Sequence, residues 1–157
     1  MTTTINSAAA NATAPSLNAR VLALAHYAGR GLLEDVLTRY GVTFHQSVTL
    51  RAVAVAGESI GVDALVGDVT GSLKESDAVI RGVIEELTAT QVLEADPADA
   101  TRVRLTDAGR DLYERTSAES AKISARLYAD IPAEDLAVAG RVLTLITQRA
   151  NAEAAAG

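Results

Sequence analysis

His26, Arg30 and His45 are residues whose side chains suit the binding of a small anionic molecule. His26 and Arg30 are four residues apart, which places them on one face of a helix, and arginine can clamp a carboxylate through two parallel hydrogen bonds. With Tyr27 beside them, they predict a pocket for an anionic aromatic ligand. The alternative, interface or surface residues without a ligand, remains open. Two histidines without a carboxylate at metal-ligand spacing predict no zinc site.

The other residue types do not indicate catalysis. The chain has no cysteine, which excludes disulfides, thiolate metal sites and cysteine nucleophiles. The acidic residues Glu85 with Glu86 and Asp63 with Asp68 have no accompanying nucleophile or phosphate-binding loop, so we interpret them as solvated helix faces. We therefore expect a protein that is not an enzyme and that uses no cofactor and no metal.

Length and composition predict one globular domain with an aliphatic core. The 157 residues are 48% hydrophobic and 22% charged but only 3% aromatic. The sequence has no apolar stretch of membrane-spanning length, and its first residues lack the pattern of a secretory signal, so we expect a cytoplasmic protein. A net charge of -6 disfavours non-specific binding to nucleic acid or anionic membranes.

Apolar residues recur at helical spacing and predict four helices in the first part of the chain. These helices are expected at residues 17–41, after Thr43 up to Gly57, at residues 62–69 before a Thr70-Gly71-Ser72 turn, and after a cap at Ser72 or Ser76. Residues 1–16 lack this period and predict a mobile tail. In the second helix, we expect burial of Val48, Leu50, Val53 and Val55. A short helix, a tight turn and another helix give the helix-turn-helix order.

The pattern then changes to that of a β-hairpin, or wing. The segment Asp96-Pro97-Ala98-Asp99 favours a turn, and the residues after it alternate between polar and apolar. This alternation places Val103 and Leu105 toward the core and places Arg102 and Arg104 on the outward face.

Two further helices are expected, one capped by Thr106 and one beginning near Pro132. Apolar helices at both ends of a chain of this size, separated by a compact middle, have stripes that a partner must cover. The sequence therefore favours a homodimer.

Three segments resemble the MarR family of bacterial transcriptional regulators. IEELTATQVLEADPAD (84–99) and VRLTDAGR (103–110) are similar to its recognition-helix end, wing turn and Leu-Thr-x-x-Gly fifth-helix start, and IPAEDL (131–136) is similar to its last-helix start. The resemblance covers about residues 17–150. It implies an obligate homodimer that presents winged helix-turn-helix units to double-stranded DNA at a pseudo-palindromic operator, and in many members a small anionic or phenolic effector.

The expected fold is mainly α with a small β-wing. After the tail at 1–16, residues 17–42 and 106–157 would form a helical dimerisation region, and residues 43–105 a winged helix-turn-helix DNA-binding region. The candidate DNA contacts are Lys74, Ser76 and Arg81 at the exposed start of the fourth helix and Arg102 and Arg104 in the wing. Solvated side chains without DNA contact are the alternative, because residues 43–105 carry five basic and ten acidic residues.

These observations predict a MarR-like dimeric DNA-binding transcriptional regulator. We expect it to repress promoter DNA and expect a small-molecule ligand to relieve this repression. The alternative is a winged-helix dimer without DNA binding that acts as a protein-interaction or ligand-binding module. The acidic middle segment is the main argument for this alternative.

Overall fold

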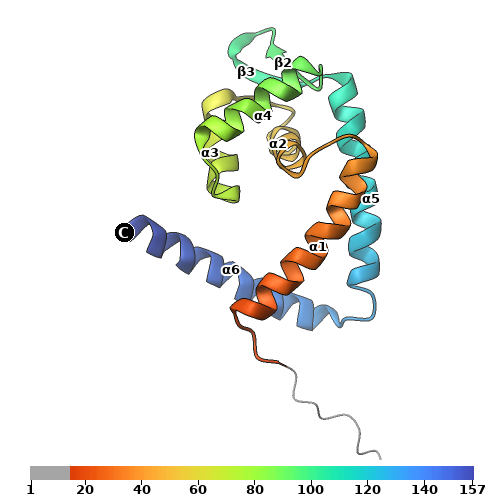
Figure 1. Cartoon of the computed structure of the whole chain (residues 1–157), viewed down its shortest axis with the longest axis vertical. Helices are drawn as coiled ribbons and strands as arrows, with labels where there is room; N and C mark the ends of the chain where they lie inside the picture. Colours follow the sequence, from red (N-terminus) through yellow and green to blue (C-terminus); the bar gives the residue numbers. More distant parts are fainter. Residues whose placement is uncertain (1–14) are drawn as a thin grey trace, which may run out of the picture. The chain divides into compact units, whose positions relative to one another are not determined.

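A computed structural model describes residues 15–157 of the chain and shows six helices and three short strands there (Figure 1). They are α1 (Ala19–Arg39), α2 (Phe44–Val55), β1 (Ser59–Gly61), α3 (Val62–Leu73), α4 (Asp77–Ala89), β2 (Leu93–Asp96), β3 (Asp99–Leu105), α5 (Asp107–Leu127) and α6 (Ala133–Ala156). The predicted fold class, mainly α with a small β-wing, is confirmed. Residues 1–14 of the predicted tail lie outside the described residues. Within the described part, no helix has both the length and the apolar character needed to cross a membrane.

The chain divides into two compact units, one ending at Ala118 and the other beginning at Glu119. The first unit contains α1 to α4, the sheet and the first part of α5. The second unit contains the rest of α5 together with α6. The helix-turn-helix and the wing thus belong to one unit.

The core of the first unit is aliphatic, as predicted. Its buried members come from α2, α3, α4 and the two longer strands: Leu50, Val53, Leu65, Val66, Val69, Ile80, Val83, Ile84, Leu87, Leu93, Val103 and Leu105. The expectation that Val55 is buried is wrong, since its exposed fraction is 69%. Val55 lies two residues beyond Val53, about 200° around the helix, and so points away from the buried face.

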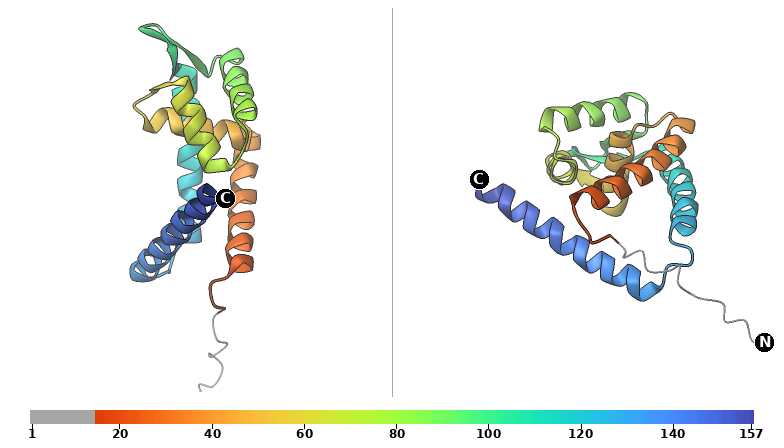
Figure 2. Two further views of the ribbon diagram at one scale, coloured as in Figure 1. Left: turned by 90° about the vertical axis from the view of Figure 1, so that its left-hand side faces the viewer. Right: turned by 60° about the horizontal axis from the view of Figure 1, so that its bottom comes forward.

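The sheet has the order β1-β3-β2 and is antiparallel throughout. The β2–β3 hairpin confirms the predicted wing, and its extension from the helices is visible in Figure 2. Val103 and Leu105 are buried, as the alternation predicts. The sequence does not predict β1, because only three residues form this strand and β3 supplies its hydrogen-bonding partners.

Two helix boundaries differ from the prediction. α3 continues through the expected Thr70-Gly71-Ser72 turn and ends at Leu73, which packs against the core. α1 is capped by the side chain of Asn18, which accepts a hydrogen bond from the backbone N–H of Val21. At α5 the predicted cap is present, since the Thr106 hydroxyl accepts from the backbone N–H of Gly109 at 2.9 Å.

Gly109 is required by close packing of α5 against Val92, in the segment between α4 and β2. It is buried, and a Cβ atom at this position would overlap the backbone carbonyl oxygen of Val92. That carbonyl also accepts the backbone N–H of Thr106 at 3.2 Å. The glycine of the Leu-Thr-x-x-Gly segment therefore permits a contact that any larger residue would block.

Candidate nucleic-acid interface

α4 has one buried face and one exposed face, as a recognition helix requires. It buries Ile80, Val83, Ile84 and Leu87 in the core of the first unit. The opposite side carries small residues, one carboxylate and one guanidinium: Ala78, Arg81, Glu85 and Ala89 are all exposed. Arg81 is the single basic residue within the α4 sequence, so positive charge on this face depends on it.

Arg81 is held by a carboxylate from the preceding helix. Its Nη2 atom lies 2.7 Å from Oδ1 of Asp63, which belongs to the first turn of α3. The hydrogen bond to Asp63, together with the negative charges of Asp63 and Asp77, raises the pKa of Arg81 above its usual value. Both partners remain open to solvent, with side-chain exposed fractions of 47% for Arg81 and 90% for Asp63.

Lys74 and Ser76 lie in the turn before α4. Ser76 is one of the two predicted caps of this helix, whereas the placement of Lys74 at the start of the helix was wrong. α3 reaches Leu73, and Lys74 then takes a left-handed backbone conformation with φ of 59° that ends the helix. Ser76 is the N-cap of α4, and its hydroxyl oxygen accepts the backbone N–H of Val79 at 3.4 Å. Both residues are exposed next to the start of α4, where a DNA backbone contact remains a prediction.

The two wing arginines lie on the strand face opposite Val103 and Leu105, as predicted, but both are half-buried and bond to groups of the chain. Arg102 donates from Nε to Oγ of Ser59 at 3.2 Å and from Nη2 to the carbonyl oxygen of Ser59 at 2.8 Å. Arg104 pairs with Glu94 across the hairpin, with N–O distances of 2.6 and 2.7 Å. A DNA contact by either residue therefore requires a change of partner or the use of its remaining N–H groups.

The hairpin turn is acidic. Hydrogen bonds from Ser59 and from the backbone N–H of Ala98 lower the pKa of Asp96, and bonds from the side chain and backbone of Thr101 lower the pKa of Asp99. Both carboxylates are thus ionised at neutral pH, and both would repel a phosphate group brought close to this turn.

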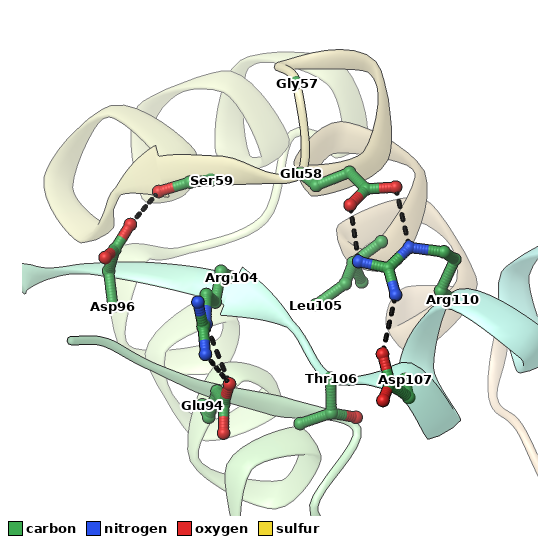
Figure 3. Close-up of a pocket in the computed structure, with 10 residues that line it drawn as sticks. All are labelled: Gly57, Glu58, Ser59, Glu94, Asp96, Arg104, Leu105, Thr106, Asp107 and Arg110. Carbon is green, nitrogen blue, oxygen red and sulfur yellow. Dashed lines mark hydrogen bonds and ion pairs between the residues drawn. The ribbon is translucent and has the colours of Figure 1, made fainter. Parts of the chain in front are cut away.

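A pocket of about 530 Å³ lies where the end of α2, the sheet and the start of α5 meet (Figure 3). Arg110 of α5 donates to both carboxylate oxygens of Glu58, at 2.9 and 2.6 Å, and to Asp107 at 2.9 Å. These bonds raise the pKa of Arg110, and the bond from Arg110 lowers the pKa of Glu58. Arg104 and Glu94 form another part of the wall. The pocket wall therefore contains three ion pairs, of which Glu58–Arg110 connects the loop before β1 to α5.

Two of the three candidate ligand residues, Arg30 and His45, share Phe44 as a neighbour, because the His45 ring packs edge-on against the Phe44 ring. The Arg30 guanidinium lies 4.3 Å from the centre of the Phe44 ring, and its Nε donates to Glu34 at 2.8 Å. His45 Nε2 lies 3.2 Å from Oε1 of Glu75. The His26 ring packs edge-on against Tyr27. Their common role in ligand binding remains a prediction.

The carboxylate partners of these arginines were not predicted from sequence. Asp63 and Arg81 are 18 residues apart, and Glu58 and Arg110 are 52 residues apart, so no local spacing relates them. The packing of α3 against α4 brings the first pair together, and the loop between α2 and β1 carries Glu58 to Arg110 of α5.

Comparison with solved structures shows which proteins share this fold. A MarR-family transcriptional regulator from Rhodococcus sp. RHA1 is 19% identical with a TM-score of 0.67, and the match covers 81% of this chain and 91% of the other. A MarR variant from E. coli complexed with operator DNA is 17% identical with a TM-score of 0.65 and the same coverage. BpsR from Bordetella bronchiseptica, whose DNA binding is regulated by 6-hydroxynicotinic acid, is 24% identical with a TM-score of 0.66 and covers 84% and 94%.

No family model matches the sequence, and no curated protein is similar to it in sequence. The TM-scores of 0.65 to 0.67 nevertheless show the same fold over 81–84% of this chain. The chain therefore has the winged-helix fold of the MarR-family transcriptional regulators, which confirms at the level of the fold the resemblance seen in its sequence.

Proposed function

We propose that the chain is a MarR-family transcriptional regulator that binds double-stranded DNA through α4 and the wing. The observation that carries this proposal is the two-sided character of α4, which buries four aliphatic residues and turns Arg81 to solvent beside a β-hairpin. The major groove admits one α-helix, and an arginine fork matches the O6 and N7 acceptors of guanine. The operator complex of the E. coli MarR variant, which has the same fold, supports this function.

The proposed regulator is a homodimer. α6 has no buried residue, and its exposed large apolar residues are Val138, Val142, Leu143, Leu145 and Ile146. α1 likewise exposes Leu22, Leu24, Tyr27 and Leu32. A second copy that covers these residues would place two α4 helices for reading half-sites about 34 Å apart. Light scattering after size exclusion tests the dimer, and a monomer at micromolar concentration would contradict it.

We further propose that the regulator represses promoter DNA and is released by a small anionic or phenolic aromatic effector. Release requires that the effector bind the DNA-incompetent state more tightly than the DNA-bound state. The regulation of BpsR by 6-hydroxynicotinic acid supports this ligand class. Arg30, His26 and His45 are the candidate contacts, and titration calorimetry of each alanine variant with a panel of aromatic carboxylates tests them.

Fluorescence anisotropy tests DNA binding directly. The dimer is titrated into its own upstream DNA and into a shuffled duplex of equal length at several salt concentrations. A regulator gives sequence-selective binding whose log affinity falls linearly with log salt. Equal affinity for the two duplexes, or no binding at low salt, would contradict the proposal.

The alternative function, a winged-helix module without DNA binding, has support of its own in the wing. Arg102 and Arg104 bond within the chain, and the hairpin turn presents Asp96 and Asp99 in ionised form. An acidic turn of this kind suits a basic protein surface better than a phosphate backbone. The anisotropy titration separates the two functions, because the module would give no selective binding at any salt concentration.

A further inference from the structure

We propose that Asp63 is a positioning residue that sets the sequence selectivity of Arg81. This inference depends on the proposed DNA-binding function. It assigns a specific task to a carboxylate that lies on α3, outside the recognition helix. Arg81 Nη2 lies 2.7 Å from Asp63 Oδ1, and this contact links the two helices at the proposed DNA-binding face.

The contact fixes the direction of a long side chain that would otherwise be mobile. An arginine loses substantial rotamer freedom when it is ordered, and an Arg81 already held in the free protein loses less of that freedom on binding DNA. One Nη2 hydrogen bond occupies a single donor of the five on a guanidinium. Enough donors remain for the two acceptors of a guanine edge.

Stability does not explain this ion pair. Asp63 has a side-chain exposed fraction of 90%, and Arg81 has 47%. Ion pairs between solvated groups of this kind contribute little to the free energy of folding. The contact is therefore available for a role in recognition, and its removal leaves the aliphatic core of α3 and α4 unchanged.

The charge of Asp63 also opposes indiscriminate binding. Asp63 and Asp77 both act on Arg81 electrostatically, and Glu85 is exposed on the same helix. A phosphate that binds Arg81 also meets the negative charges of Asp63 and Asp77, whereas a guanine edge offers neutral acceptors. The pair thus weakens backbone contacts more than base contacts, which raises the ratio of specific to random affinity.

The experiment compares Asp63→Ala, Asp63→Asn and the control Asp68→Ala, which removes an exposed carboxylate from the same helix. Each dimer is titrated against its selected operator and against shuffled DNA. We expect Asp63→Ala to lower the ratio of the two affinities roughly tenfold, the discrimination expected of one bidentate contact. Asp63→Asn keeps an acceptor oxygen without the charge, so it should retain the affinity for the operator while random DNA binds more tightly.

A second measurement does not depend on DNA. The ¹⁵N relaxation of the Arg81 Nε–H group reports the order of the side chain in the free protein, and we expect this order to fall in Asp63→Ala but not in Asp68→Ala. Unchanged order and an unchanged affinity ratio in Asp63→Ala would overturn the inference while the regulator assignment stands. Wild-type protein that binds both duplexes equally would overturn the proposed function and this inference together.

Discussion

Replacing Gly109 with alanine tests the packing that joins α5 to the wing. The new Cβ would overlap the Val92 carbonyl oxygen, a backbone atom that cannot rotate away. Overpacking of this type costs about 1–3 kcal/mol, and disturbing the 3.2 Å bond from Thr106 to the same carbonyl costs about 1 kcal/mol more. The higher helix propensity of alanine offsets up to about 1 kcal/mol.

The expected net loss for Gly109→Ala is thus about 1–3 kcal/mol in the free energy of unfolding. Urea unfolding followed by circular dichroism at 222 nm measures this loss directly. Gly67→Ala is the matched control, because Gly67 lies inside α3 and its Cβ would meet no atom within 4 Å. The control should be neutral or slightly stabilising. Equal urea midpoints for Gly109→Ala and Gly67→Ala would show that the contact between Gly109 and Val92 does not limit stability.

Three further predictions concern charged groups. Arg81→Ala should weaken binding mainly to the specific operator, about tenfold or more, and an equal loss on random DNA in anisotropy would reassign the residue to backbone contact. Arg102→Ala combined with Arg104→Ala should weaken binding to all sequences and flatten the salt dependence, whereas an unchanged salt slope would remove the wing from the interface. The Arg110 hydrogen bond holds the pKa of Glu58 below its ordinary value of 4.5. The stabilisation of the folded state by ionised Glu58 is therefore present above that pH and is lost as the pH falls below it. The free energy of unfolding of Glu58→Gln should therefore depend less on pH below about 4.5 than that of the wild type. Identical plots of stability against pH for the two proteins would exclude the Glu58–Arg110 pair as a cause of acid unfolding.

The sequence predicts elements with a strong period or a clear cap. The helix after the Ser76 cap and the alternation at Val103 and Leu105 were both correctly predicted, because each depends on neighbours along one element. β1 and the end of α3 were not correctly predicted, because tertiary contacts decide them. β1 exists through its pairing with β3, and Leu73 extends α3 by packing on the core.

The basic side chains of the candidate interface could be predicted from the sequence, but the carboxylates that pair with them could not. A spacing rule identifies arginines that share a strand face, and the wing arginines do lie outward. No spacing rule finds the pairs of Arg81 with Asp63 or of Arg104 with Glu94, since each joins two separate elements. The net charge of a segment is therefore a poor guide to the potential at one of its side chains.

The pairing of arginines with carboxylates has a consequence for kinetics. Proteins with large positive fields capture DNA by long-range steering, which raises association rates far above those of neutral partners. Here the field of Arg81 and Arg104 is largely cancelled within a few ångströms of each guanidinium. We expect encounters with a duplex near the unsteered rate of roughly 10⁵–10⁶ M⁻¹s⁻¹. The lifetime of the complex, rather than the speed of its formation, would then decide how long a promoter stays occupied.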